Sequence, residues 1–130
     1  MGYRRLFIMR KDLNMSPSKL AAQVGHCAEV YWLHYFQKGA MPTDNDYNYM
    51  NQAIVKTICE AKNKNHLLKV VDKAKDIGLI EGVDYSFIRD KCLTELEPED
   101  EDGTTLTGIW FAPLPDDMAH ELSKKYQLYK

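Results

Sequence analysis

A lysine, a glutamine and a histidine share helical spacing in the segment that begins at Ser16. At about 100° per residue, Lys19, Gln23 and His26 fall within an arc of about 60° on a helix surface. Ser16 has a residue type preferred at a helix N-cap, and Pro17 suits the first helical position. The cation of Lys19 then lies in the first turn, where the helix amides disfavour positive charge by about 0.3–1 kcal/mol. This row is either an ordinary solvated face or one wall of a site that binds an anion.

A carboxylate and several hydroxyls follow much later in the chain. Asp90 ends an alternating apolar segment, and Thr94 comes shortly after it. Site residues of α/β proteins often stand at strand ends, and a carboxylate near Lys19 could accept a proton or orient water. The alternative is an aspartate that only turns the chain at a strand end. Thr105 and Thr107 are typical strand residues, and their residue type alone assigns them no chemistry.

Composition limits the class of protein. The 130 residues suffice for one domain, residues 1–130, with a hydrophobic core. The 3 cysteines include no CxxC spacing, which argues against a disulfide scaffold or structural zinc and for a reducing compartment. The apolar run Leu6–Met9 is too short for a membrane span or the core of a signal peptide. We therefore expect a cytoplasmic protein with no membrane segment.

No motif for a bound cofactor occurs in the sequence. It contains no P-loop, GxGxxG, HExxH, GxSxG or zinc-ligand spacing. The sequence therefore predicts neither a metal ion nor a nucleotide cofactor.

Charge is balanced overall but unevenly distributed. The formal net charge of −2 means that any binding of nucleic acid must use a local patch. The acidic run between Thr94 and Thr105 would repel phosphates, so we expect an exposed, mobile hairpin tip directed away from any nucleic acid. Basic residues gather elsewhere and form either a phosphate patch or a solubilising surface: Arg4, Arg5, Arg10, Lys11, Lys19, Lys56, Lys62, Lys64 and Lys69.

Hydrophobic periodicity predicts an α/β fold. Strands are expected over 3–10, 53–59, 85–90 and 105–112, and helices over 16–37, 47–51, 65–77 and 116–124. Asn65 is the expected cap of the third helix. Helical crossovers should give parallel strand pairs, and the connection between the third and fourth strands should give an antiparallel pair. The prediction is a three-layer sandwich, with a mixed four-stranded sheet and helices on both faces.

Two groups of motifs follow one another along nearly the whole chain. The first comprises residues 10–15 (RKDLNM), residues 18–23 (SKLAAQ) and His26, and the second comprises residues 88–90 (IRD), 94–96 (TEL) and 105–109 (TLTGI), with Pro113. In this order they resemble the archaeal and eukaryotic peptidyl-tRNA hydrolase 2 family. The first group is similar to the family pattern R-x-D-L-x-M-x-x-G-K-x-A-A-Q-x-x-H, and the second to I-x-D-x-x-x-T-x-I followed by T-V-L-G-I-G-P.

The resemblance implies hydrolysis of the ester that joins a peptide to the 3′ end of tRNA, without a metal or cofactor. It also implies a peptidyl-tRNA partner, bound through the acceptor end, and a homodimer. In the corresponding hypothesis Asp90 is the base that orients a water molecule or the Thr94 hydroxyl, Lys19 stabilises developing negative charge, and Thr105 holds the network. The implied catalytic residues are Lys19, Asp90, Thr94 and Thr105, and the implied substrate-binding residues are Gln23, His26, Arg10 and Lys11.

Several residues depart from the family pattern around this site. Ser18 replaces the glycine before the lysine, residues 91–93 (KCL) replace A-G-R, and the acidic run lengthens the turn before Thr105. The closing residues 124–130 resemble a divergent branch, the Pth2-domain-containing proteins. The alternative function is therefore a catalytically weak or inactive module of the same fold that binds tRNA or a protein partner. An active enzyme requires the Lys19 amine and the Asp90 carboxylate to lie within hydrogen-bond reach.

Overall fold

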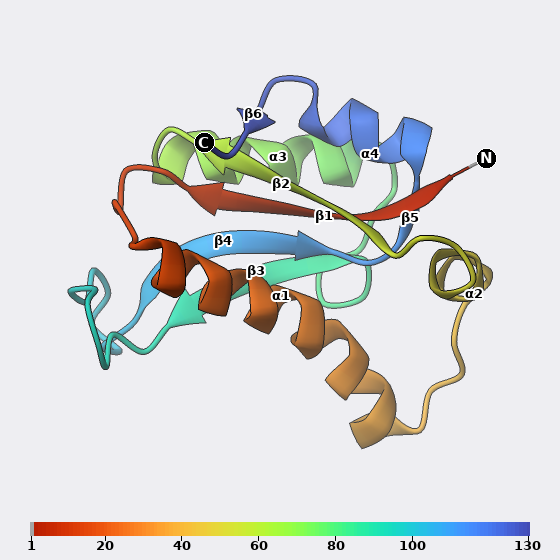
Figure 1. Cartoon of the computed structure of the whole chain (residues 1–130), viewed down its shortest axis with the longest axis horizontal. Coiled ribbons are helices and arrows are strands. Elements are labelled where there is room, and N and C mark those ends of the chain that lie inside the picture. The colour runs from red at the N-terminus through yellow and green to blue at the C-terminus, as the bar shows by residue number, and fades with distance from the viewer. Residues whose placement is uncertain (1) are drawn as a thin grey trace.

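One open mixed sheet carries helices on both of its faces (Figure 1). The structure is a computed structural model and describes residues 2–130. The elements in chain order are β1 (Tyr3–Arg10), α1 (Pro17–Lys38), α2 (Asp44–Met50), β2 (Val55–Ala61), α3 (Lys64–Asp76), β3 (Tyr85–Asp90), β4 (Thr105–Phe111), β5 (Leu114–Pro115), α4 (Asp116–Ser123) and β6 (Gln127–Leu128).

The sheet has the order β3-β4-β1-β2-β6, and β5 also pairs with β1. The predicted mixed α/β sheet is confirmed, but the expected number of strands is wrong, because the sheet has 6 strands in residues 2–130. The additional strands, β5 and β6, have 2 residues each, too few for any sequence periodicity. Of the expected parallel pairs only β1–β2 forms, because β3 pairs with β4 and not with β2. The antiparallel pair β3–β4 is confirmed.

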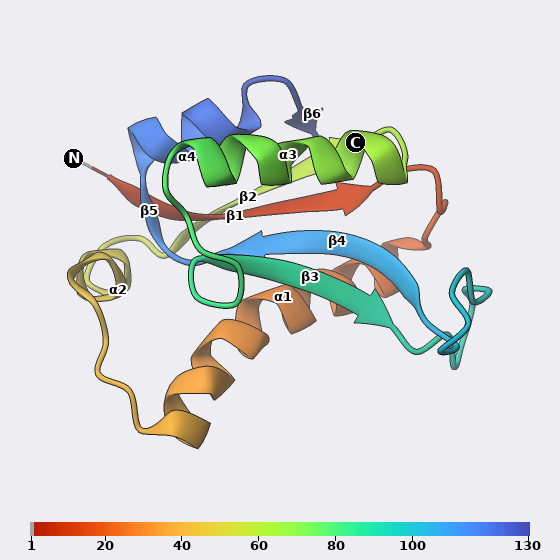
Figure 2. The ribbon, with the colours of Figure 1, turned by 180° about the vertical axis from the view of Figure 1, so that it is seen from behind.

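The two faces of the sheet bury two separate apolar clusters, which gives the predicted three layers. Helix α1 crosses one face, and α3 and α4 cover the other (Figures 1 and 2). Strand β1 serves both clusters, because alternate residues of a strand point to opposite faces. Leu6 and Ile8 join the cluster under α3 and α4, whereas Phe7 and Met9 join Cys27 of α1.

Side-chain caps begin α1, α2 and α3, and the starts of α2 and α3 differ from the prediction. Asn63, not Asn65, caps α3: its side chain accepts a hydrogen bond from the backbone amide of His66. Asn63 has an extended backbone conformation, which is typical of an N-cap residue, so α3 can begin soon after β2 ends. Helix α2 begins earlier than expected because Thr43 and Asp46 form a reciprocal capping box.

Strands β1, β2 and β3 run in the same direction, so their last residues meet at one edge of the sheet, on the left in Figure 1. Helix α1 begins at this edge, and the 91–104 connection lies beside it. The edge therefore brings together segments that are far apart in the sequence. None of the helices within residues 2–130 combines the length and hydropathy that a membrane-spanning segment requires.

Candidate active site

Lys19, Asp90 and Thr94 meet at this edge of the sheet. The Lys19 Nζ atom lies 2.9 Å from Asp90 Oδ1 and donates a second hydrogen bond of 2.9 Å to Thr94 Oγ1. The Lys19 and Asp90 side chains are 11% and 10% exposed, so the pair lies at the rim, shielded but within reach of a ligand. The required contact between amine and carboxylate is confirmed.

Three donors hold the Asp90 carboxylate. Oδ1 accepts from Lys19 and also from Gln23 Nε2, at 3.2 Å. Oδ2 accepts from the backbone N–H of Cys92, at 3.0 Å. Cys92 has a φ of 59°, a left-handed conformation that a residue other than glycine rarely adopts, and this turn aims its amide back at the carboxylate. Oδ2 keeps a lone pair for another donor, because a carboxylate oxygen accepts more than one hydrogen bond.

Carboxylates from elsewhere in the chain compensate the positive charge of Lys19 in the first turn of α1. Ser16 caps the helix, as predicted, and its hydroxyl accepts from the Lys19 amide at 3.1 Å. Glu95 then accepts from the Ser16 amide at 2.8 Å and from the Ser16 hydroxyl at 2.7 Å. These two hydrogen bonds lower the pKa of Glu95. Glu95 and Asp90 supply the negative charge that the first turn of α1 itself lacks.

The acidic run is exposed, as predicted, but the expectation that it points away from the site is wrong. Glu99 forms a salt bridge of 2.5 Å with Arg10, and Asp100 forms one of 2.7 Å with Arg89. Glu95 lies against the start of α1 and not away from it. The run remains largely exposed, but basic partners hold it close to the edge of the sheet.

Thr105 holds residues 97–99 of the acidic run by hydrogen bonds. Its side chain is buried, donates to the Glu97 carbonyl at 2.7 Å and accepts from the Glu99 amide at 3.0 Å. It lies opposite Asp90 in the β3–β4 ladder. The Cys92 thiol is 3.5 Å from its hydroxyl. Thr105 thus holds the segment that carries the site and forms no hydrogen bond with Lys19.

The other predicted site residues lie outside the cluster. Arg10 is 3% exposed and holds Asp12 and Glu99; burial opposes its charge, but these hydrogen bonds raise the pKa of Arg10 overall. Lys11 folds back over the Tyr129 ring and onto the carbonyl of Lys130. His26 is exposed on α1, and its imidazole forms no hydrogen bond within residues 2–130.

The proposed phosphate patch also needs correction. Arg5 is fully buried and Arg10 nearly so, and neither side chain can belong to a surface patch. In residues 2–130 no group of His, Cys, Asp and Glu side chains is placed to hold a metal ion.

Two residues of the cluster had no clear signal in the sequence. Thr107 resembles an ordinary strand residue, yet its hydroxyl lies 2.7 Å from Gln23 Oε1. Glu95 belongs to an acidic run whose other members make different contacts. From the sequence alone, only the order of the family motifs indicated that these segments lie close together.

Comparisons with known proteins agree with this site. The family described as Peptidyl-tRNA hydrolase PTH2 matches residues 3–129. The chain belongs to this family. A peptidyl-tRNA hydrolase of Methanopyrus kandleri is 36% identical over 97 residues, 74% of this chain and 76% of the relative. One of Methanococcus vannielii is 28% identical over 126 residues, 97% of this chain and 98% of the relative.

A eukaryotic member of the family also matches along the chain. The protein named peptidyl-tRNA hydrolase 2, mitochondrial, of Mus musculus is 28% identical over 127 residues. That match covers 98% of this chain and 64% of the mouse protein. The family resemblance seen in the motifs is therefore confirmed across the full length of this fold.

Proposed function

We propose that the chain is a peptidyl-tRNA hydrolase that cleaves the ester between a peptide and the 3′ end of tRNA. The observation that carries the proposal is the Lys19–Asp90–Thr94 cluster at the edge of the sheet, in a chain that the family matches over residues 3–129. The proposal assigns no step to a metal ion or a cofactor.

Lys19 supplies positive charge to the reacting ester. An ammonium group has three N–H donors, and Asp90 and Thr94 take two of them. The third is directed to the ester carbonyl oxygen, which gains negative charge as the tetrahedral intermediate forms. A fixed donor at a shielded rim stabilises that charge more strongly than water does.

Asp90 orients the attacking water and takes its proton. Its Oδ1 is occupied by Lys19 and Gln23, so the water is held by Oδ2. The water oxygen bonds to the carbonyl carbon, and the carboxylate accepts the proton. The ester C–O bond then breaks, and the proton passes to the ribose oxygen. The products are a free peptide carboxyl group and a tRNA with a free 3′ end.

Thr94 and Thr105 have different parts in the proposal. Thr94 accepts from Lys19, so its own hydroxyl hydrogen is available to a substrate oxygen. Thr105 holds the 97–99 segment and positions the loop that carries Thr94. Of the proposed substrate-binding residues, His26 has the exposure needed to contact tRNA, whereas Arg10 and Gln23 are buried.

The decisive experiment measures release of tRNA from a model peptidyl-tRNA. We expect wild-type protein to cleave it and Asp90→Asn to lose at least about a hundredfold in kcat/KM, since the amide cannot accept the proton. Asp72→Asn, on the exposed side of α3, is the matched control and should retain activity. Failure of well-folded wild-type protein to release tRNA would contradict the proposal.

A binding module of the same fold is the second candidate. The departures from the family pattern favour it: Cys92 occupies a left-handed turn where the pattern has glycine, and the acidic run lengthens the connection before Thr105. Such a module would bind tRNA, or a protein partner, without cleaving the ester. Equal tRNA affinity of wild type and Asp90→Asn, with no release of product, would support this candidate.

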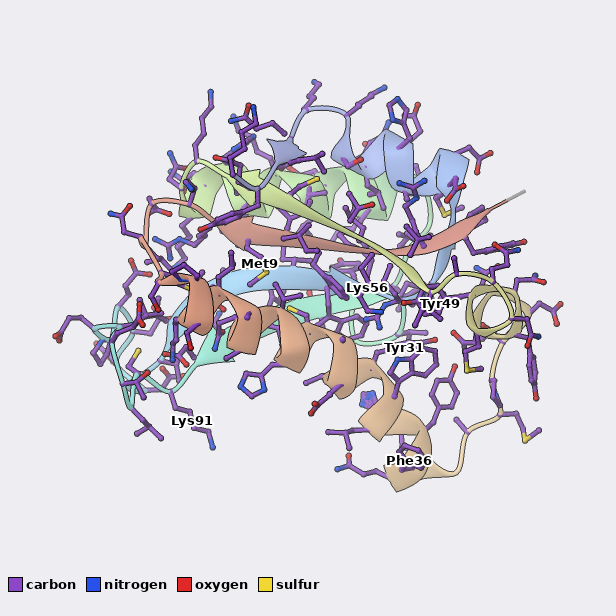
Figure 3. All side chains as sticks on the ribbon, in the orientation of Figure 1. Met9, Tyr31, Phe36, Tyr49, Lys56 and Lys91 are labelled. Atoms are coloured by element: carbon purple, nitrogen blue, oxygen red, sulfur yellow. The ribbon has the colours of Figure 1, made fainter. Side chains whose placement is uncertain are left out.

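We also propose that the chain forms a homodimer. Support comes from large apolar side chains exposed near the end of α1 and after it, with Leu33 at 47%, Phe36 at 84% and Met41 at 79% exposure. Figure 3 shows Phe36 at the outer end of α1. Light scattering coupled to size exclusion should give twice the mass of the chain, and Phe36→Asp should return it to a monomer.

The cytoplasmic location remains a proposal. It is supported by the three thiols, all of which are free. Fractionation of cells that express the tagged protein would test it, and recovery in an organelle would contradict it.

A further inference from the structure

Thr107 and Gln23 form a buried pair behind the cluster. Gln23 is 1% exposed and Thr107 is fully buried. The Thr107 hydroxyl lies 2.7 Å from Gln23 Oε1, and the other end of the same amide reaches Asp90 Oδ1, at 3.2 Å. A continuous chain of hydrogen bonds therefore runs from β4, through α1, to the carboxylate at the end of β3.

The chemistry of the groups fixes the direction of every hydrogen in this chain. An ionised carboxylate only accepts, so Gln23 must present its NH2 group to Asp90. The amide oxygen then faces Thr107, and the Thr107 hydroxyl must donate to it. The hydroxyl also lies 3.2 Å from the Ile88 carbonyl. If its hydrogen went there instead, two oxygen atoms would meet at 2.7 Å without a hydrogen between them.

Strand geometry brings Thr107 to this point. A register irregularity between Ile88 and Arg89 lies opposite Thr107 in the β3–β4 ladder. Such irregularities redirect side chains and are frequent beside active sites. The next residue, Gly108, lies so close to Met9 that a Cβ atom would come within 2.5 Å of its sulfur. The irregularity lies opposite Thr107, and the absence of a side chain at Gly108 allows β4 to approach β1 closely beside it.

We propose that Thr107 is a positioning residue for the reaction: it holds Gln23 in the amide orientation that donates to Asp90. The inference rests on the proposed function for its effect on turnover. It gives Gln23 a different task from binding substrate, since both polar ends of its side chain are used inside the protein. The family pattern quoted above has leucine at the position of Thr107, so this donor is a feature of the present chain.

The first test compares two substitutions of Thr107, one that removes the hydroxyl and one that keeps it. Thr107→Val removes the hydroxyl and keeps the shape, and we expect it to lower kcat by roughly tenfold with little change in KM. Thr107→Ser keeps a donor and should restore most of that loss. Thr57→Val removes a threonine hydroxyl of β2, which accepts from Arg4, and is the matched control. Equal kcat values for Thr107→Val and wild type would overturn the proposal.

A double-mutant cycle separates positioning from a purely structural role. If Thr107 acts through Gln23, then Thr107→Val should add little once Gln23→Leu is present. If the two losses in kcat instead multiply, the proposal is wrong. Thermal unfolding of all variants identifies any loss caused by unfolding, and kcat is compared per folded molecule.

A spectroscopic measurement keeps this proposal distinct from the proposed function. NMR can follow the side-chain NH2 group of Gln23, and Thr107→Val should shift its signals while Thr57→Val should not. If wild-type protein is inactive but Thr107→Val shifts these signals, the proposed hydrolase activity is wrong and the hydrogen-bond chain is supported. If wild-type protein is active but the signals do not shift, the hydrogen-bond chain is wrong and the hydrolase activity is supported.

Discussion

Helix α1 contacts two polar clusters that differ in their access to solvent. Near its start, Lys19 meets Asp90 and Thr94 at the rim of the sheet. Further along, the helix covers Arg5 of β1 and presents Tyr31 to the second cluster. Both clusters place a cation beside α1, but the first reaches solvent, where a ligand can bind, and the second is closed to it.

Each of the three guanidinium nitrogens of Arg5 donates a hydrogen bond to the protein, and the side chain is fully buried. The guanidinium donates to the carbonyls of Phe111 at 2.6 Å, Cys27 at 3.2 Å and Ala28 at 3.3 Å, and its Cζ atom lies 4.9 Å from the centre of the Phe7 ring. Burial lowers the pKa of Arg5 to about 10. The cluster is closed to solvent and joins β1, α1 and β4.

Asp46 completes this second cluster and fastens α2 to α1. It is fully buried and accepts from the Tyr31 hydroxyl at 2.8 Å, from the Tyr35 hydroxyl and from the Thr43 amide at 2.9 Å. The comparison teaches that a buried charge alone does not indicate a site. An unused donor next to solvent distinguishes Lys19 from Arg5, and substitutions at the two positions should separate activity from stability.

The largest expected effect is on activity, at Lys19. Lys19→Met should lower kcat/KM for peptidyl-tRNA by about a hundredfold or more, because it removes the donor to the developing oxyanion. The free energy of unfolding should change by no more than about 1 kcal/mol, since Asp90 keeps two other donors. Tritium or gel assays of tRNA release, with urea unfolding alongside, check both values. A variant that cleaves like wild type would contradict the role of Lys19.

The next effect is on stability, at Arg5. Arg5→Met leaves three backbone carbonyls without their donor and should lower the free energy of unfolding by about 3 kcal/mol. Turnover per folded molecule should stay near that of wild type. Arg4→Met, which breaks a partly exposed salt bridge with Asp116, should change stability by less than about 1 kcal/mol. Equal losses of stability for Arg4→Met and Arg5→Met would contradict the stabilising role of the buried arginine.

A smaller effect is expected at Tyr31. Tyr31→Phe removes one of the hydrogen bonds to Asp46 and should destabilise the protein by about 1 kcal/mol, because two other donors remain. Tyr47→Phe, on the exposed side of α2, is the control and should have no measurable effect. Urea titration of the three proteins measures the difference, and an unchanged midpoint for Tyr31→Phe would show that the bond adds nothing.

The smallest effect should appear as a pH dependence at Glu95. Hydrogen bonds from Ser16 lower the pKa of Glu95 below its ordinary value of 4.5, so the ionised side chain stabilises the fold above that pH. This contribution is lost as the pH falls through the lowered pKa. At neutral pH wild-type protein should therefore have a higher melting temperature than Glu95→Gln, and this difference should disappear in acid. Glu101→Gln serves as the control. A difference in melting temperature that grows in acid would contradict the expected direction.

The sequence predicted the long elements and the central part of the site for physical reasons. Apolar periodicity defined β1 and α1 within a residue or two, and Ser16 marked the helix start correctly. Strands β5 and β6 were missed because two-residue strands exist only through their partners. Lys19, Asp90 and Thr94 could be grouped from the family motifs, whereas the Thr107–Gln23 pair depends on a strand irregularity that no periodicity reveals.

Cys92 provides a natural attachment point for a reporter group. Burial raises the pKa of the other two thiols, to about 12 for Cys27, so neither Cys27 nor Cys59 should react at neutral pH. Cys92 is partly exposed, and its amide binds the Asp90 carboxylate. A fluorophore or spin label coupled to the native chain would therefore lie beside Asp90 without any engineered cysteine. Its emission or line shape would follow the arrival and departure of a tRNA end in real time.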